Sequence, residues 1–145
     1  MAVQQITPGE AYRLLGSGHR YIDVRTEAEF VAGHPLGAVN IPVALLDPHT
    51  RRMTFNPDFL RVVEVHFAKT APIIVGCQSG GRSQQAAELL QQAGYTTLAN
   101  MQGGFGGARD AAGREVAAGW AQSGLPLCTE CGAQDAYATL RRALS

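Results

Sequence analysis

The chain has 145 residues, 46% of them hydrophobic, which is enough for a single domain with one core. Its 12 basic and 12 acidic residues balance, so we expect no nucleic-acid binding. The sequence shows no charged leader followed by an apolar run and no apolar segment of about 20 residues, so we expect no signal peptide and no membrane association. Three cysteines are an odd count, which does not suit a secreted disulfide framework and favours a reducing, cytoplasmic location.

Two capping boxes open helices in the first half of the chain. Thr7 stands three residues before Glu10, and Thr26 three residues before Glu29, the spacing at which side chain and backbone cap each other. Farther on, apolar residues at helical spacing predict a longer helix. In chain order, the predicted elements are a helix at 8–15, a strand at 21–24, a helical turn at 27–32, a strand at 38–43 and a helix at 57–68.

The second half alternates in the same way. The apolar run IIV at 73–75 is typical of a central strand that is buried on both faces. It is followed by a predicted helix at 83–93, a strand at 96–100 and a terminal helix at 133–144. Strands that alternate with helices indicate an α/β fold in which helices cover both faces of a parallel sheet.

Polar and glycine residues gather where the predicted strands end. Asp23 and Arg25 close one strand, Cys77 closes another, and Gly103 and Gly104 follow a third. Ligands of open parallel sheets bind beyond the carboxyl ends of the strands. The pattern therefore predicts one site at this edge of the sheet.

The segment from Cys77 to Ser83, CQSGGRS, joins a strand to a helix and carries the strongest chemical signal. Glycines let the backbone N–H groups of such a loop turn inward, and the helix N-terminus adds positive potential, so the loop can hold an anion and favour a thiolate. Arg82 adds a fixed positive charge with forked donors. A buried structural cysteine in an ordinary turn is the alternative, but it does not account for Arg82 and Ser83 at this spacing.

Three segments in the right order resemble the rhodanese-like sulfurtransferases. They are YIDVRTEAEFVAGHPLGAVNIPV, the cysteine loop and NMQGGFGGARD, and the resemblance covers roughly residues 6–126. It implies a five-stranded parallel sheet flanked by helices on both faces, formed by residues 1–126. Residues 127–145 would then form a tail with a C-x-x-C motif and a helix, packed on or following this domain.

The resemblance also implies an activity, in which Cys77 accepts a sulfane sulfur from thiosulfate or a persulfide and passes it to cyanide, a thiol or a protein cysteine. No metal or organic cofactor is required for this chemistry. Carried over position by position, Cys77 and Arg82 are catalytic. Substrate binding or support of the loop falls to Gln78, Ser79, Gly80, Gly81, Ser83, Asp23 and Arg25.

Two other functions remain open at this point. A module of this fold can bind proteins or sense sulfur without turnover, although such a module would normally lose the cysteine that this chain keeps. A phosphatase or arsenate reductase is disfavoured, because only four residues separate Cys77 from Arg82 and a tetrahedral oxyanion needs a longer loop. Gln78, which is neutral where many relatives of this type carry a basic residue, favours a donor other than dianionic thiosulfate.

The C-x-x-C motif, Cys128 to Cys131, has several interpretations. It can relay sulfur from Cys77, form a redox pair or be incidental, and the last reading is slightly favoured over a relay. A structural zinc site is not expected, because it would need two further ligands and the sequence has no second cysteine pair.

Overall fold

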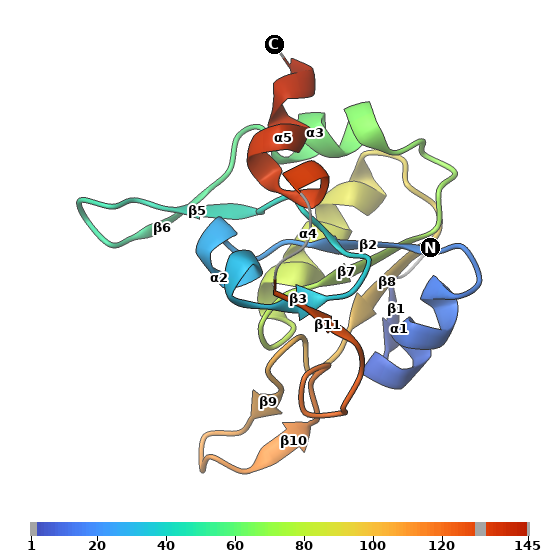
Figure 1. Cartoon of the computed structure of the whole chain (residues 1–145), viewed down its shortest axis with the longest axis vertical. Coiled ribbons are helices and arrows are strands. Elements are labelled where there is room, and N and C mark those ends of the chain that lie inside the picture. The colour runs from blue at the N-terminus through green and yellow to red at the C-terminus, as the bar shows by residue number, and fades with distance from the viewer. Residues whose placement is uncertain (1–2, 130–132, 145) are drawn as a thin grey trace.

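A central sheet of five parallel strands organises the computed structural model, which describes residues 3–129 and 133–144 (Figure 1). The strands lie in the order β1-β8-β7-β2-β4, and every neighbouring pair is parallel. Their bounds are β1 Gln4–Ile6, β2 Arg20–Asp23, β4 Val39–Asn40, β7 Ile73–Gly76 and β8 Leu98–Met101. The predicted α/β class and parallel sheet are confirmed.

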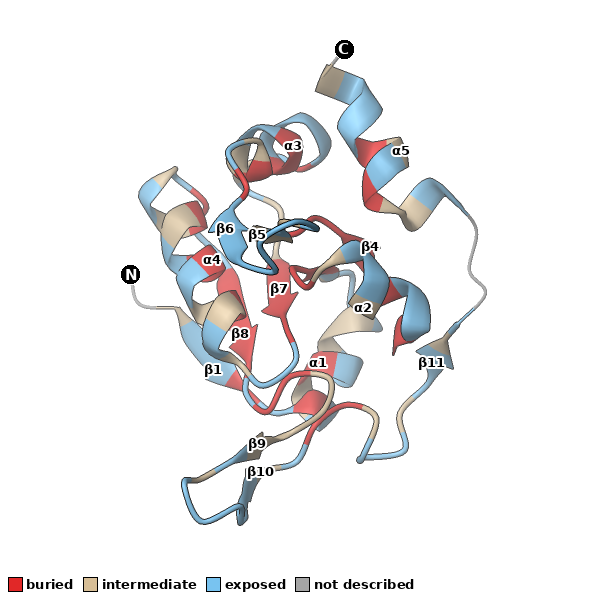
Figure 2. Cartoon of the chain, turned by 90° about the vertical axis from the view of Figure 1, so that its left-hand side faces the viewer, coloured by how far each residue is buried: buried red, intermediate tan, exposed pale blue. Residues whose placement is uncertain are grey.

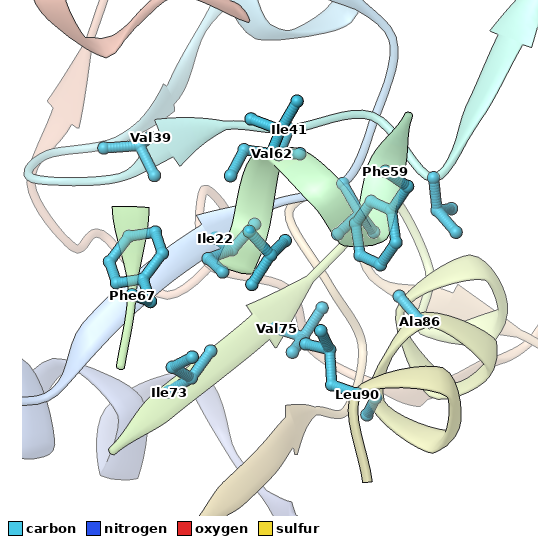
Figure 3. Packing of buried hydrophobic residues seen from close by; sticks show 14 of the residues in the cluster. Ile22, Val39, Ile41, Phe59, Val62, Phe67, Ile73, Val75, Ala86 and Leu90 are labelled. Carbon is cyan, nitrogen blue, oxygen red and sulfur yellow. The ribbon is translucent and has the colours of Figure 1, made fainter. Parts of the chain in front are cut away.

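Helices cover both faces of this sheet. Along β2 and β7 successive side chains alternate between two hydrophobic clusters, because neighbouring residues of a strand point to opposite faces. One cluster packs against α3 and α4 (Figure 3) and also against α5. The other packs against α1, α2 and the segment around Trp120. The helices are α1 Pro8–Leu15, α2 Glu27–Ala32, α3 Phe59–His66, α4 Gly81–Gln92 and α5 Tyr137–Arg141, with 3₁₀ turns η1 Ala133–Asp135 and η2 Arg142–Leu144.

Among the described residues, three short antiparallel pairs of strands lie outside the central sheet. Two of them are hairpins that project from the body of the molecule (Figure 1), and the third ties the chain near its C-terminal end to the loop after α2. The strands at the centre are buried, whereas the β9–β10 hairpin is largely exposed (Figure 2). The pairs are β5 Ala44–Leu46 with β6 Met53–Phe55, β9 Ala108–Arg109 with β10 Glu115–Ala117, and β3 His34–Pro35 with β11 Leu127–Cys128.

Both predicted capping boxes are confirmed. The Thr7 hydroxyl accepts a hydrogen bond from the Glu10 backbone, and the Glu10 carboxylate accepts one from the Thr7 backbone. Thr26 and Glu29 exchange the same pair of bonds at the start of α2. The two helices occupy the predicted ranges because these local bonds satisfy backbone donors that a helix N-terminus otherwise leaves free.

Other boundaries differ from the prediction. The strand expected at 38–43 shrinks to Val39–Asn40, and the helix expected from Ser83 begins at Gly81, with Gly80 as its N-cap. Pro42 lies just beyond the shortened strand, where it has no backbone donor to continue a ladder. The terminal helix expected at 133–144 breaks into η1, α5 and η2, because Ala136 adopts an extended backbone (φ −80°, ψ 145°).

Helix α5 packs on the core formed by the central sheet. Tyr137 and Leu140 of α5 are buried in the core cluster that contains Ile22, and the Tyr137 hydroxyl accepts a hydrogen bond of 2.9 Å from Asn56. These contacts place α5 on the core of the central sheet, and the division at residue 126 stays a prediction. Across residues 3–129 and 133–144, none of the helices has the length and apolar character needed to cross a membrane.

Candidate active site

Cys77 follows β7 directly and lies at the bottom of the loop that leads into α4. Its side chain is 2% exposed. The sulfur accepts a hydrogen bond from the backbone N–H of Gly80 at 3.1 Å, and the Ser83 hydroxyl lies 3.3 Å away. Since Gly80 caps the 12-residue helix α4, the sulfur also lies near the positive end of the helix dipole. The Gly80 N–H and the N-terminus of α4 can stabilise an anion at this position.

Gly80 is the residue that gives the loop its shape. Its φ of 115° lies in a region that glycine adopts readily and side-chain-bearing residues avoid. In this conformation its N–H points back to the Cys77 sulfur. Gly81, by contrast, begins the helix, and a side chain there would meet open space. Of the two predicted cradle glycines, Gly80 therefore has the direct contact.

A second glycine-rich loop, residues 103–107, braces the cysteine loop from outside. The backbone N–H of Phe105 donates to the Cys77 carbonyl at 2.7 Å, and that of Gly106 donates to the Gln78 carbonyl at 2.9 Å. A side chain on Gly104 would have its first carbon 2.3 Å from the Cys77 carbonyl oxygen, so only glycine permits this approach. The two loops consequently hold each other in place.

Asp23 and Arg25 form a buried ion pair beside this brace. Their side chains are 1% and 3% exposed, and the guanidinium reaches Asp23 Oδ2 at 2.8 Å and the Gly33 carbonyl at 2.6 Å. The guanidinium also stacks over the Phe105 ring, 4.4 Å from its centroid. Asn40 donates to the backbone carbonyls of both residues. The pair thus contacts the 103–107 loop through Phe105, and the role in substrate binding or loop support expected for Asp23 and Arg25 stays a prediction.

The side chain of Gln78 is turned toward Arg25. Its Oε1 accepts a hydrogen bond from Arg25 Nη1 at 3.3 Å, and its amide nitrogen fills the space that a side chain on Gly106 would need. In this arrangement Gln78 joins the buried ion pair to the loop.

Arg82 directs its guanidinium at Glu29 on α2. Two parallel bonds of 2.8 and 3.0 Å join Nη1 and Nη2 to the two carboxylate oxygens. Burial would raise the pKa of Glu29, but the hydrogen bonds and charge of Arg82, with bonds from Thr26, outweigh it and lower the pKa to about 2. The hydrogen bonds to Glu29 in turn raise the pKa of Arg82. The sequence predicted the charge of Arg82 but not its partner.

Two hollows flank the cysteine loop. The smaller one, of about 520 Å³, is lined by Ser79, Gly80 and polar side chains such as Gln84, and also by the apolar residues Val116 and Ala117. A larger, more apolar groove of about 820 Å³ lies on the side of Arg82 and Glu29, between α4 and the β5–β6 hairpin. Of the predicted cradle residues, Ser79 and Gly80 therefore lie at the wall of the smaller hollow.

Asn100 belongs to the site but was not among the predicted residues. It lies in β8, is 4% exposed and hydrogen bonds to Ser83, the same hydroxyl that contacts Cys77. Its contacts connect Ser83 to Gln5 on β1. A polar residue within the otherwise apolar strand LANM was the available signal, because a buried amide needs partners.

The C-x-x-C motif is only partly within the described residues. Cys128 lies in β11 opposite His34, whereas Cys131 lies outside the described residues. The relay interpretation therefore stays a prediction. Within the part of the chain that the structure describes, no three His, Cys, Asp or Glu side chains gather as a metal site would require.

The sequence and the fold both resemble those of known proteins. The sequence matches the Rhodanese-like domain family over residues 7–111. It is 44% identical over 116 residues to Thiosulfate sulfurtransferase 16, chloroplastic, of Arabidopsis thaliana, covering 80% of this chain and 85% of that protein. Thiosulfate sulfurtransferase 18 of the same plant is 43% identical over 105 residues, covering 71% and 76%. The crystal structure of Rv0390 from M. tuberculosis has a TM-score of 0.74 at 33% identity, covering 90% of this chain and 100% of that one.

Proposed function

Because the chain belongs to the rhodanese-like domain family, we propose that it is a sulfurtransferase that carries a sulfane sulfur as a persulfide on Cys77. The observation that supports this most directly is the setting of the Cys77 sulfur, which faces the Gly80 N–H, the Ser83 hydroxyl and the N-terminus of α4. These groups stabilise a thiolate before the reaction and a persulfide anion after the first step.

The proposed reaction has two displacement steps. The Cys77 thiolate attacks the outer sulfur of thiosulfate, the sulfur–sulfur bond of the donor breaks, and sulfite leaves with the electron pair. An acceptor nucleophile (cyanide, a thiol or a protein cysteine) then attacks the terminal sulfur of the persulfide, and Cys77 leaves as a thiolate. The cycle balances without an outside oxidant or reductant, and the proposal invokes no metal or organic cofactor.

The remaining residues are proposed to hold the loop and its charge. Arg82 supplies a positive charge at the start of α4, and its two bonds to Glu29 fix the direction of its guanidinium. The Asp23–Arg25 pair holds Gln78 and the loop of residues 103–107 in place. Because Gln78 is neutral and engaged by Arg25, we expect a persulfide donor to load Cys77 more readily than dianionic thiosulfate. The odd cysteine count remains the reason to propose a cytoplasmic setting.

Intact-protein mass spectrometry tests the proposal directly. The protein is incubated with thiosulfate or with a persulfide donor, and then with cyanide. We expect a gain of one sulfur atom that peptide mapping assigns to Cys77, followed by its loss with release of thiocyanate. The Cys77→Ser variant should keep its fold, as judged by circular dichroism, and gain nothing at this position.

The outcomes separate the competing functions. Sulfur transfer that survives Cys77→Ser would refute the assignment. A folded protein that takes up no sulfur from either donor would instead favour a binding module without turnover. Rapid hydrolysis of an aryl phosphate would favour a phosphatase, against the short loop between Cys77 and Arg82.

A further inference from the structure

A continuous chain of polar side chains runs from solvent to the sulfur of Cys77. The Ser83 hydroxyl lies 3.3 Å from the sulfur and 2.5 Å from Asn100 Oδ1. The other end of the Asn100 amide lies 2.9 Å from Gln5 Oε1, and the Gln5 amide nitrogen lies 2.6 Å from Gln84 Oε1. We refer to Ser83, Asn100, Gln5 and Gln84 as the amide relay.

The inner half of the amide relay is shielded from water, whereas its outer half is not. Ser83 is 0% and Asn100 4% exposed, while the bond between Gln5 and Gln84 is exposed at the wall of the smaller hollow. A buried polar group has to find its hydrogen-bond partners within the protein. The protein therefore decides whether Ser83 or Asn100 is the donor in their hydrogen bond, because water cannot reach the pair to act as an alternative partner.

Ser83 has a single hydroxyl hydrogen and three acceptors for it. The Cys77 sulfur, the Gly80 carbonyl at 3.1 Å and Asn100 Oδ1 all lie within reach. When Ser83 donates to Asn100, it presents lone pairs to the sulfur, which suits a thiol that donates its own hydrogen. A thiolate or a persulfide anion has no hydrogen to donate and needs the Ser83 hydrogen for itself.

A side-chain amide can serve either state, because it carries a donor at one end and an acceptor at the other. If the Asn100 amide turns over, its NH₂ donates to Ser83 and its oxygen accepts from Gln5. Turning the Gln5 and Gln84 amides in the same way keeps every bond of the relay. Each group then donates inward, and the last donor is the Ser83 hydroxyl, directed at the sulfur.

We propose that Asn100 is a positioning residue of sulfur transfer, whose amide reverses direction as Cys77 changes between thiol and anion and so releases the Ser83 hydrogen to the sulfur. The inference rests on the proposed function for its place in a reaction. Its physical content, the coupling of Asn100 to the thiolate through Ser83, is measurable without any sulfur donor. Failure of the proposed function and failure of this coupling are therefore distinguishable.

The test uses Asn100→Asp, because a carboxylate accepts hydrogen bonds and cannot reverse. It should hold the Ser83 hydrogen and disfavour the thiolate. We expect the midpoint of the pH profile for alkylation by iodoacetamide to rise by about one to two pH units, which makes alkylation roughly 10- to 100-fold slower at any pH below both midpoints. Release of sulfite in a single turnover should slow in parallel.

A double-mutant cycle separates the relay from the added negative charge. In a Ser83→Ala background the hydroxyl is gone, so Asn100→Asp should shift the profile much less than it does beside Ser83. Equal shifts in the two backgrounds would mean that charge alone acts, and would overturn the proposal. An unchanged profile for Asn100→Asp would overturn it as well.

Two further variants guard against trivial explanations. Asn56→Asp is the matched control, because Asn56 is a buried amide that bonds to Pro42 and Tyr137 rather than to the cysteine loop, and it should leave the profile unchanged. If Asn100→Asp does not fold, Gln5→Glu imposes the same direction from the exposed end of the relay. It should raise the midpoint by a smaller amount, and only when Ser83 is present; a shift that survives Ser83→Ala undiminished would refute the relay.

Discussion

Replacing Glu29 with Gln tests how the charge of Arg82 is held beside the cysteine loop. The Glu29 carboxylate has two tasks, since it accepts both bonds from the Arg82 guanidinium and also caps α2 through the backbone of Thr26. Gln keeps the size of the side chain and one acceptor oxygen but removes the negative charge. The substitution therefore isolates the ionic part of both contacts.

The expected magnitude follows from the acidity of Glu29. Burial raises its pKa, but the Arg82 and Thr26 contacts lower it from the ordinary value of 4.5 to about 2. That difference corresponds to at most about 3.4 kcal/mol of stability at neutral pH. Because the two side chains remain 28% and 32% exposed, screening by solvent reduces this ceiling, and we expect a loss of about 1–2 kcal/mol.

Urea unfolding at several pH values measures the loss and its origin. The folded pKa lies below the unfolded one, so the ionised carboxylate contributes fully above pH 4.5 and its contribution disappears as the pH falls toward 2. Wild type should exceed Glu29→Gln by about 1–2 kcal/mol at pH 7 and match it near pH 2. Glu27→Gln, an exposed position in the same helical turn, serves as the control and should change little.

The outcome at low pH decides whether the reasoning holds. A deficit of the same size at pH 7 and near pH 2 would show that the variant loses packing or a neutral hydrogen bond rather than an ionic contact. No deficit at pH 7 would show that solvent already screens the pair. Either result would remove the Arg82–Glu29 pair as a source of order for the cysteine loop.

Two further predictions concern the same loop and its brace. Arg82→Ala should slow sulfur loading of Cys77 roughly tenfold, the scale of one charge-assisted bond. Because it also removes the bidentate pair with Glu29, it should cost at least the loss of about 1–2 kcal/mol expected for Glu29→Gln. Loading rates equal to wild type, measured by rapid quench and mass spectrometry, would remove Arg82 from the mechanism. Gly104→Ala should destabilise the fold by more than 2 kcal/mol in urea, because the new carbon meets the Cys77 carbonyl at 2.3 Å in a backbone with φ 57°. Gly113→Ala is the control, because Gly113 has φ 82° but open space around it and its loss of stability reports backbone strain alone. If the two variants lose equal stability, steric crowding between Gly104 and the Cys77 carbonyl is refuted.

Most helices and strands could be predicted from local sequence patterns. The capping boxes at Thr7 and Thr26 set their helices through bonds within four residues, and the apolar run at 73–75 reads as a buried strand whatever surrounds it. Strand β1 escaped prediction because it has three residues, of which only Ile6 is buried, and it exists by pairing with β8 about 95 positions later in the chain. Such a strand leaves no local signal.

In the site too, contacts within one loop could be predicted, whereas contacts between distant segments could not. Cys77, Gly80 and Ser83 were predicted from one loop, and the structure brings them into contact. The partner of Arg82 lies 53 residues away on another helix, and Asn100 reaches Ser83 from a neighbouring strand. A sequence pattern places residues along the chain, whereas these contacts depend on how parallel strands stack the ends of distant segments at one edge.

The brace between the two loops also determines how the site opens. The amide hydrogens of Phe105 and Gly106 are held by the carbonyls of Cys77 and Gln78, so neither can exchange with solvent until the cysteine loop parts from its neighbour. Their exchange rates therefore report on the order of the nucleophile's loop from outside it, without a label at the reactive residue. A ligand or a persulfide that tightens the loop will appear there as slower deuterium uptake, which separates ordering of the loop from the chemistry at sulfur.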